Sequence, residues 1–108
     1  MAISCLGGIR VNNKSIVQTI DTSNDTVYFK VDGKVLLSID SSGYVTKTDQ
    51  EKYIGKFSLL KNLWVFCFFN DNFVSVNNCD KITTTLYNLL DAEMYVVKEL
   101  IKQNVLEV

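Results

Sequence analysis

The pattern of apolar and polar residues is clearest over residues 27–47, where apolar side chains alternate with polar ones between two glycine-containing turns. Alternation with a period of two is typical of a half-buried β-strand. A three-residue loop with Gly33 in the left-handed conformation would pair Phe29 with Val35 and would separate an apolar face from a polar one. That apolar face would consist of Val27, Phe29, Val35, Leu37 and Ile39. A two-residue turn at Asp32-Gly33 would mix charged and apolar side chains on both faces, so the three-residue loop is predicted.

The second turn lies at residues 40–43 and follows the same logic. Aspartate is favoured at the first position of a type I turn, so Asp40 would begin the turn and Gly43 would take the left-handed position that follows. Ile39 would then pair with Val45 and would extend the apolar face. The sequence therefore predicts a three-stranded antiparallel meander over residues 27–47.

Similar runs of β-branched and aromatic residues predict strands on both sides of this meander. Residues 9–20 indicate two short strands around an asparagine turn, and residues 52–60 indicate another strand with a bulge or kink at Gly55. Residues 63–69 are continuously apolar, so the strand that contains them needs to be covered on both faces.

A polar turn follows the aromatic strand, with Asn72 as its expected left-handed residue. The turn leads into a further short strand at residues 73–76. We therefore predict antiparallel strands over residues 9–77, preceded by a flexible N-terminus at residues 1–8.

After residue 77 the period changes to that of a helix, which predicts one amphipathic helix over residues 80–104, capped by Asp80 or by a threonine. Its apolar arc is wider than one sheet face requires. The arc consists of Leu86, Leu89, Leu90, Met94, Val96, Val97, Leu100 and Ile101.

We expect one side of this helix to cover the sheet, and we expect the other side to form an oligomer interface. The expected interface stripe is Tyr87, Leu90, Met94, Val97 and Ile101. The alternative is that the sheet wraps around the helix on both sides. Residues 105–108 are compatible with a short strand.

Together these elements predict a mainly β fold with a C-terminal α-helix (α+β). The expected architecture is an antiparallel meander, small sandwich or barrel closed by one helix. A chain of 108 residues fits a single domain over residues 1–108.

Composition and charge argue against several classes of function. The chain has 11 basic and 12 acidic residues, for a formal net charge of −1, so we expect no nucleic acid partner. It has no histidine, which removes the most common general base and metal ligand. The longest apolar run, residues 63–69, is too short to span a bilayer, so no membrane insertion is expected. The first residues, MAISCLGG, lack the pattern of a secretory signal.

The candidate chemical groups have simple structural explanations. Cys5, Cys67 and Cys79 form no CxxC pair, and we expect reduced, mostly buried thiols, with Cys5 the most exposed. Residues 21–32 resemble part of a calcium-binding loop. The sixth position is Thr26 instead of glycine, and the bidentate glutamate is missing, so a polar turn is expected. We predict no catalytic residue, no metal site and no cofactor.

The segment FKVDGKVLLSIDSSGYVT resembles the short β-repeats of phage and viral fibre proteins. The matching positions are Phe29, Gly33, Ile39, Asp40, Gly43 and Val45, and residues 7–26 resemble the lead-in to such repeats. The aromatic segment at residues 56–76 and the terminal helix depart from the fibre pattern, which raises a compact head, cap or adaptor as the alternative to a fibre shaft. The resemblance implies a homotrimeric virion structural protein without catalytic residues, with itself and other virion proteins as partners.

The first interpretation is therefore a non-enzymatic virion structural protein (fibre, head or tail component). It would form a homo-oligomer through β-structure and a C-terminal helix and would be assembled in the host cytoplasm. The alternative is a small cytoplasmic peptide- or lipid-binding module, because several strands followed by one amphipathic helix also match the outline of a pleckstrin-homology-like domain. Such a domain usually has a basic cluster in its first loops, whereas Arg10, Lys14 and Lys30 are scattered.

Overall fold

The computed structural model describes residues 3–48, 53–69, 81–84 and 88–107. Within these residues, the strands are β1 (Ile3–Val11), β2 (Lys14–Asp21), β3 (Thr26–Val31), β4 (Lys34–Ile39), β5 (Tyr44–Lys47), β6 (Tyr53–Leu60), β7 (Leu63–Phe68) and β8 (Lys81–Thr83), and the helix is α1 (Leu89–Lys102). Each strand pairs antiparallel with the next strand in sequence, so the spatial order runs from β1 to β8. The prediction of a mainly β fold with a C-terminal helix is confirmed.

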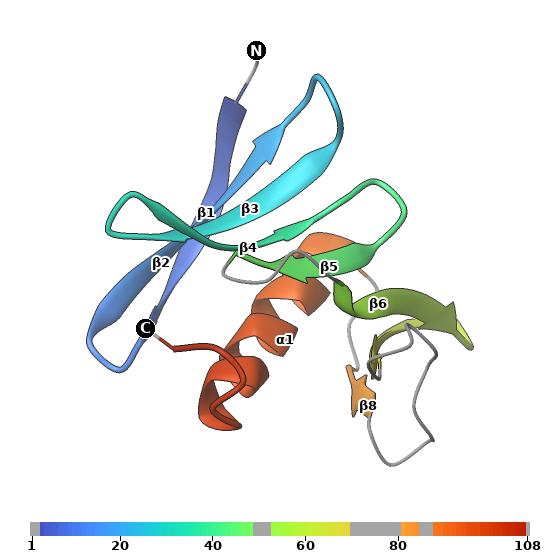
Figure 1. The fold of residues 1–108 in the computed structure, drawn as a ribbon. Coiled ribbons are helices and arrows are strands. Elements are labelled where there is room, and N and C mark those ends of the chain that lie inside the picture. The colour runs from blue at the N-terminus through green and yellow to red at the C-terminus, as the bar shows by residue number, and fades with distance from the viewer. Residues whose placement is uncertain (1–2, 49–52, 70–80, 85–87, 108) are drawn as a thin grey trace.

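The sheet curls around α1 as an open half-barrel (Figure 1). The helix contacts β1 at one edge of the sheet and β7 near the other edge. Both halves of the sheet therefore pack on the same helix, which lies on the concave side. This arrangement matches the alternative in which the sheet wraps around the helix on both sides.

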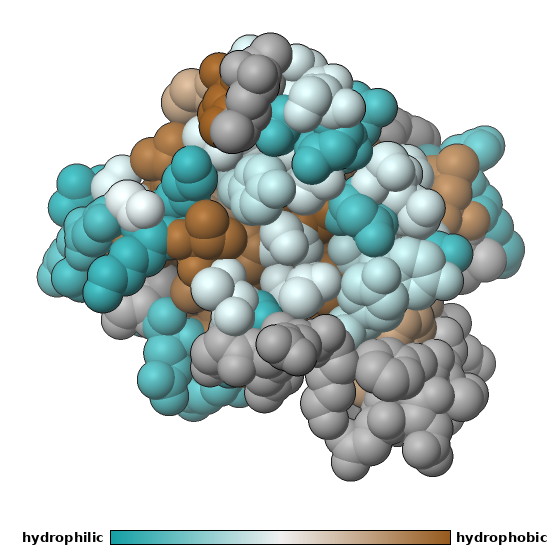
Figure 2. All heavy atoms as spheres, turned by 45° about the horizontal axis from the view of Figure 1, so that its top comes forward, coloured by the Kyte–Doolittle hydropathy of each residue, from teal (hydrophilic) through white to brown (hydrophobic). Residues whose placement is uncertain are grey.

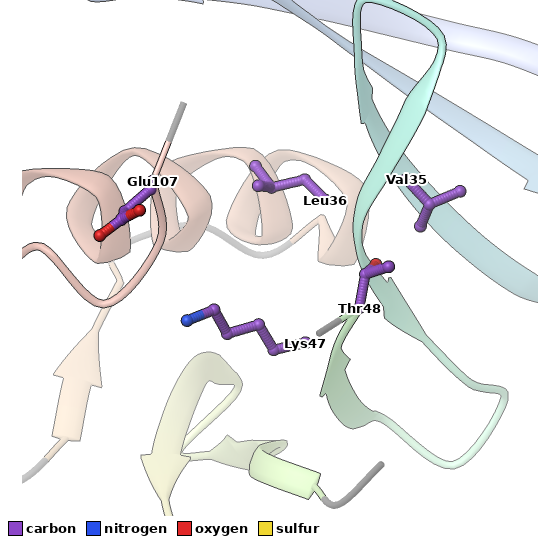
Figure 3. Close-up of a pocket in the computed structure, with 5 residues that line it drawn as sticks. All are labelled: Val35, Leu36, Lys47, Thr48 and Glu107. Atoms are coloured by element: carbon purple, nitrogen blue, oxygen red, sulfur yellow. The ribbon is translucent and has the colours of Figure 1, made fainter. Parts of the chain in front are cut away.

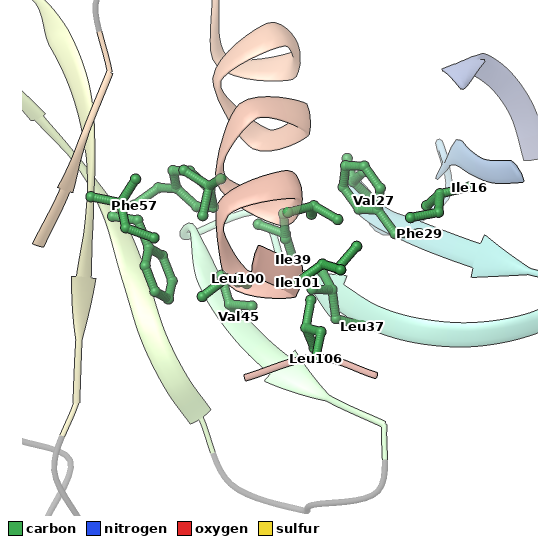
Figure 4. Close-up of a cluster of buried hydrophobic side chains, with 14 residues drawn as sticks. Ile16, Val27, Phe29, Leu37, Ile39, Val45, Phe57, Leu100, Ile101 and Leu106 are labelled. Carbon is green, nitrogen blue, oxygen red and sulfur yellow. The ribbon is translucent and has the colours of Figure 1, made fainter. Parts of the chain in front are cut away.

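The hydrophobic core fills the space between the concave face of the sheet and the inner face of α1 (Figure 4). Burying one large apolar side chain stabilises a fold by about 1.5–3 kcal/mol, so the shared core holds the helix and the strands together. The buried members of this cluster are Ile16, Val27, Phe29, Leu37, Ile39, Val45, Phe57, Phe66, Ile82, Val96, Val97, Leu100, Ile101 and Leu106.

The turn between β3 and β4 differs from the prediction. Asp32 and Gly33 both have positive φ, at 52° and 79°, as in a two-residue type I′ turn. Lys30 pairs with Val35 and Phe29 pairs with Leu37, so the register shifts by one residue inside β4. The predicted three-residue loop and its Phe29–Val35 pair are therefore wrong.

A bulge explains why the predicted core face of this hairpin still forms in large part. Leu36 is the extra residue of β4, and beyond it the alternation returns to the predicted phase. Phe29 and Leu37 are fully buried as expected. Val35 is the exception, because it lies opposite Lys30 and is only half-buried, while Leu36 packs against the core in its place.

The turn between β4 and β5 forms as predicted. Gly43 has a φ of 88°, and Ile39 pairs with Val45. The Asp40 carboxylate accepts hydrogen bonds from the backbone amides of Ser42 at 2.9 Å and Tyr44 at 3.0 Å, which fixes the loop. The three-stranded meander over residues 27–47 is thereby confirmed.

The N-terminal region is more ordered than predicted. Residues 3–8, which were expected to be flexible, form the first part of β1 and pair with β2 as far as Asp21. Leu6 is the extra residue at a register shift between Cys5 and Gly7, and such a bulge lets a glycine-containing segment follow a twisted neighbour. Asn12 and Asn13 make the predicted asparagine turn, with φ values of 52° and 64°.

The helix begins later than predicted. Residues 81–83 form β8, because they complete the ladder on the edge of β7, where Phe66 pairs with Ile82. Asn88 caps α1 by accepting hydrogen bonds from the amides of Leu90 at 2.9 Å and Asp91 at 3.2 Å. Asp80 lies outside the described residues. Residues 105–107 form no strand, and Leu106 instead packs into the core.

The aromatic strand β7 is buried on both faces, as its composition requires. Phe66 is part of the central core, and Val65, which points the opposite way, is also buried. Gly55 on β6 allows this packing, because a Cβ atom there would lie 2.3 Å from the Phe66 ring. The bulge that was predicted at Gly55 lies one residue earlier, at Ile54. The predicted turn at Asn72 and the strand at residues 73–76 lie outside the described residues.

Candidate functional site

The stripe predicted as an oligomer interface mostly faces the interior of the chain. Val97 and Ile101 are buried, with 1% and 4% of their surface exposed. Leu90 and Met94 are half-buried against the same core. Tyr87 lies outside the described residues. The two fully buried side chains are not accessible to a partner, because strands of the same chain already cover them.

The two predicted turn glycines both have positive φ, as expected, and lie in the turns that precede and follow β4. Gly33 is at the tip of the β3–β4 hairpin, and a Cβ atom there would meet nothing within 4 Å. Gly43 is tighter, because a Cβ atom there would lie 3.1 Å from the carbonyl oxygen of Phe57. These residues shape the sheet and carry no reactive group.

β1 forms a free edge of the sheet. It pairs with β2 on one side, and no described strand pairs with it on the other. Ile3 and Leu6 on this strand are exposed at 50% and 37%. An edge strand presents unpaired backbone amides and carbonyls to a neighbour, so β1 is suited to pairing with another chain.

The outer face of the sheet beside β1 also has apolar surface. Ile3, Tyr28 and Val35 line a small hollow of about 150 Å³ there, together with Asp21 and Lys30. Hydrogen bonds from the hydroxyl and the amide of Ser23 hold the pKa of Asp21 below its usual value. On the face shown in Figure 2, apolar residues reach the surface in separate patches with polar residues between them. A partner would therefore meet a local apolar contact at the edge.

A second cavity lies where β4 and the end of β5 face the C-terminal segment (Figure 3). Its volume is about 340 Å³, and it is lined by Val35, Leu36, Lys47, Thr48 and Glu107. Lys47 extends toward the side on which Glu107 lies, so charges of opposite sign share the cavity. This pair favours neither an anionic nor a cationic ligand.

Glu93 is the residue that the sequence interpretation missed. It lies in the second turn of α1 with 1% of its surface exposed. Neither carboxyl oxygen has a hydrogen-bond partner within the described part of the chain. Burial raises the pKa of Glu93 to about 8, because the low-polarity interior disfavours the ionised form. At neutral pH the group is mostly a neutral acid.

The position of Glu93 along the helix already indicated that its side chain is buried. Val97 and Ile101 follow Glu93 at steps of four residues, so the three share one row of the helix. The sequence interpretation considered only the apolar arc of this helix. A carboxyl group that begins a row of core residues is instead a candidate for a buried ionisable group.

The remaining candidate groups have ordinary surroundings. Asp21 accepts hydrogen bonds from the Ser23 hydroxyl at 2.6 Å and the Ser23 amide at 3.0 Å, which is the geometry of the expected polar turn. No group of three possible metal ligands occurs among the residues that the structure describes. Cys5 is exposed as predicted, Cys67 is half-buried, and Cys79 lies outside the described ranges.

The fold and these surfaces define a class of protein: an antiparallel half-barrel wrapped around a C-terminal helix, with β1 and β8 as the edge strands of the described sheet and an unpartnered, buried carboxyl group at Glu93. No family model, curated protein or solved structure matches the chain. Within the described ranges, α1 and any other helical segment fall short of the length and apolar character needed to cross a membrane.

Proposed function

We propose that the chain is a non-enzymatic structural protein of a virus particle and that it assembles with copies of itself through the free edge of β1. The observation that carries the proposal is the nine-residue strand β1, which lacks a second partner among the described strands and exposes Ile3 and Leu6. The resemblance of residues 7–47 to viral fibre repeats supports the virion as its location, with assembly in the host cytoplasm.

Pairing between two β1 edges would satisfy backbone groups and cover apolar side chains in one step. An antiparallel pair of identical edges is isologous and closes as a dimer, whereas contact between unlike edges builds a ring such as a trimer. The bulge at Leu6 limits the register in which a second strand adds, which favours a defined oligomer over open-ended growth. In this proposal α1 supports the sheet from within and contributes little to the contact between copies.

The test is the mass of the protein in solution. Multi-angle light scattering should give a dimer or a trimer for the parent chain. Leu6→Lys should give a folded monomer, because a charged side chain on the edge opposes pairing. Leu59→Lys is the matched control: Leu59 is 56% exposed, but it lies on β6, which pairs on both sides, so this variant should keep the mass of the parent.

A monomeric parent at tens of micromolar would overturn the proposal. It would favour the alternative function, a small cytoplasmic peptide- or lipid-binding module with the strand-and-helix outline of a pleckstrin-homology-like domain. Equal loss of mass in Leu6→Lys and Leu59→Lys would place the interface elsewhere than the β1 edge and would also contradict the proposal.

A further inference from the structure

A cavity of about 250 Å³ opens at the end of the half-barrel where the first turns of α1 meet two strand connections. Its lining comes from β2, β3 and β4, from the β2–β3 and β4–β5 connections, and from the helix. The lining residues are Ile20, Asp25, Val27, Ile39, Asp40, Ser41, Gly43, Leu89, Leu90 and Glu93. The cavity has room for about eight water molecules by liquid volume, which is slightly below the size of pockets for drug-sized ligands. It therefore suits a small ligand or a single side chain.

The walls of this cavity are apolar and its charged groups are all acidic. Ile20, Val27 and Ile39 line it from the sheet, and the leucines of the first helical turn line it from α1. Asp25 and Asp40 lie on the strand connections. None of its described lining residues carries a positive charge. The electrostatic preference is therefore for a cation with an apolar body.

Glu93 distinguishes this cavity from an ordinary surface hollow. Glu93 is one of the lining residues, and both of its carboxyl oxygens are sealed from solvent and have no partner among the described residues. An unpaired buried carboxyl group costs free energy, and a bound group that donates hydrogen bonds to it would recover part of that cost. Gln18 on β2 also reaches α1, but its side-chain nitrogen donates to the carbonyl oxygen of Leu90 at 3.2 Å and not to Glu93.

The start of the helix does not reverse this preference. A helix N-terminus attracts anions through its free amides. Here the Asn88 side chain accepts hydrogen bonds from the amides of Leu90 and Asp91, so these two donors are occupied. Asp25 and Asp40 therefore set the sign of the charge at the cavity.

We propose that this cavity binds a primary ammonium group carried on a short apolar chain, with the ammonium paired to Glu93 and the chain packed against Ile20, Val27 and Ile39. The ligand is either a free alkyl amine or a lysine side chain of a peptide, since both present the same chemistry. The oxygens of Glu93 are sealed in the free protein, so the side chain has to turn toward the cavity for this pair to form. The site is separate from the β1 edge, so it does not depend on the proposed assembly.

The probes are n-pentylamine, n-pentanol as a neutral control of similar length, and Nα-acetyl-lysine methylamide as the side-chain form. Binding is followed by the amide resonances of Gly43, Leu90 and Glu93 in ¹H–¹⁵N NMR titrations. We expect n-pentylamine to bind about tenfold more tightly than n-pentanol, which corresponds to about 1.4 kcal/mol. Saturation by the lysine amide at equal or lower concentration identifies a peptide as the source, and saturation by n-pentylamine alone identifies a free amine.

The variant Glu93→Gln should lower the affinity for n-pentylamine to that for n-pentanol. Gln has the same shape and no charge, so the fold should be kept. Glu99→Gln is the matched control on the same helix, because Glu99 contacts Lys102 at 3.5 Å and does not line the cavity. This variant should bind n-pentylamine as the parent does.

A second measurement does not depend on any variant. The pKa of Glu93, followed by the ¹³C shift of its carboxyl carbon, should fall when n-pentylamine is added, because a bound ammonium stabilises the carboxylate. Equal affinity for the amine and the alcohol would overturn the proposal. An unchanged pKa of Glu93 at saturating amine, or a Glu93→Gln variant that binds the amine like the parent, would overturn it as well.

Discussion

Glu93 makes the stability of the protein depend on pH in an unusual direction. Its pKa is about 8 in the folded chain against an ordinary value of 4.5, so the folded state holds a proton that the unfolded state releases between these values. The contribution of Glu93 to the free energy of unfolding is complete below pH 4.5. It falls as the pH rises toward 8 and then levels off. Most buried carboxyl groups that are ion-paired show the opposite trend.

We predict that Glu93→Gln removes this dependence. The variant should unfold at nearly the same temperature as the parent at pH 5 and should be more stable at pH 9, by more than about 1.4 kcal/mol, the equivalent of one pKa unit. Thermal unfolding by circular dichroism at the two values measures this difference. Asp25 and Asp40 are present in both proteins, so their effect cancels. A variant that loses stability at pH 9 would show that Glu93 is not buried in the way described.

The two turn glycines should differ in how much they tolerate a side chain. Both have positive φ, which costs a non-glycine residue on the order of 1–2 kcal/mol. At Gly43 the new Cβ would also press on the Phe57 carbonyl oxygen at 3.1 Å, whereas the space at Gly33 is open. Gly43→Ala should therefore lower the free energy of unfolding more than Gly33→Ala in urea titrations. The reverse order would mean that the Phe57 carbonyl oxygen does not limit the space at Gly43.

At the scale of elements, α1 is the helix against which the concave face of the sheet packs. The side chains of two adjacent rows, Ala92, Val96 and Leu100 in one and Glu93, Val97 and Ile101 in the other, are buried. Beside these rows, Leu89, Leu90 and Met94 are partly buried against the core. The exposed side of the helix carries Asp91, Tyr95, Lys98 and Lys102. Each row has a spacing of four residues, so the two rows form one continuous face. The buried face of the helix therefore forms part of the core of the domain.

The variant Val97→Asp tests that role. An unpaired charge in the core costs more than most single substitutions, and we expect a loss of more than about 4 kcal/mol and an unfolded product. Tyr95→Asp is the control, because Tyr95 lies two residues away on the exposed side, and this variant should remain folded. Circular dichroism and light scattering report the outcome together. A folded monomer from Val97→Asp would restore the sequence-based idea that this stripe faces another subunit.

At the scale of the whole molecule, the sequence predicted the individual strands and turns better than it predicted the contacts between elements. The alternation over residues 27–47 was sufficient to place three strands, and Gly43 gave the correct turn. The β3–β4 turn was wrong because a bulge at Leu36 reconciles the two-residue turn with an apolar core face, and a period of two cannot reveal an extra residue in advance. The helix start was wrong because Ile82 pairs with Phe66 across the sheet, a contact far apart in sequence. Glu93 was missed because its burial depends on strands that approach from outside the helix.

The neighbour-to-neighbour order of the strands has a consequence for how the chain folds. The connections from β1 to β7 have five residues or fewer, so we expect these strands to pair one after another without waiting for distant segments. The helix follows all the described strands and contacts both β7 and β1. Until it docks, the apolar side chains of the concave face, with Phe29 and Phe66 among them, stay in contact with water. We therefore expect helix docking to be the last step of folding and the step that protects the newly made chain from aggregation.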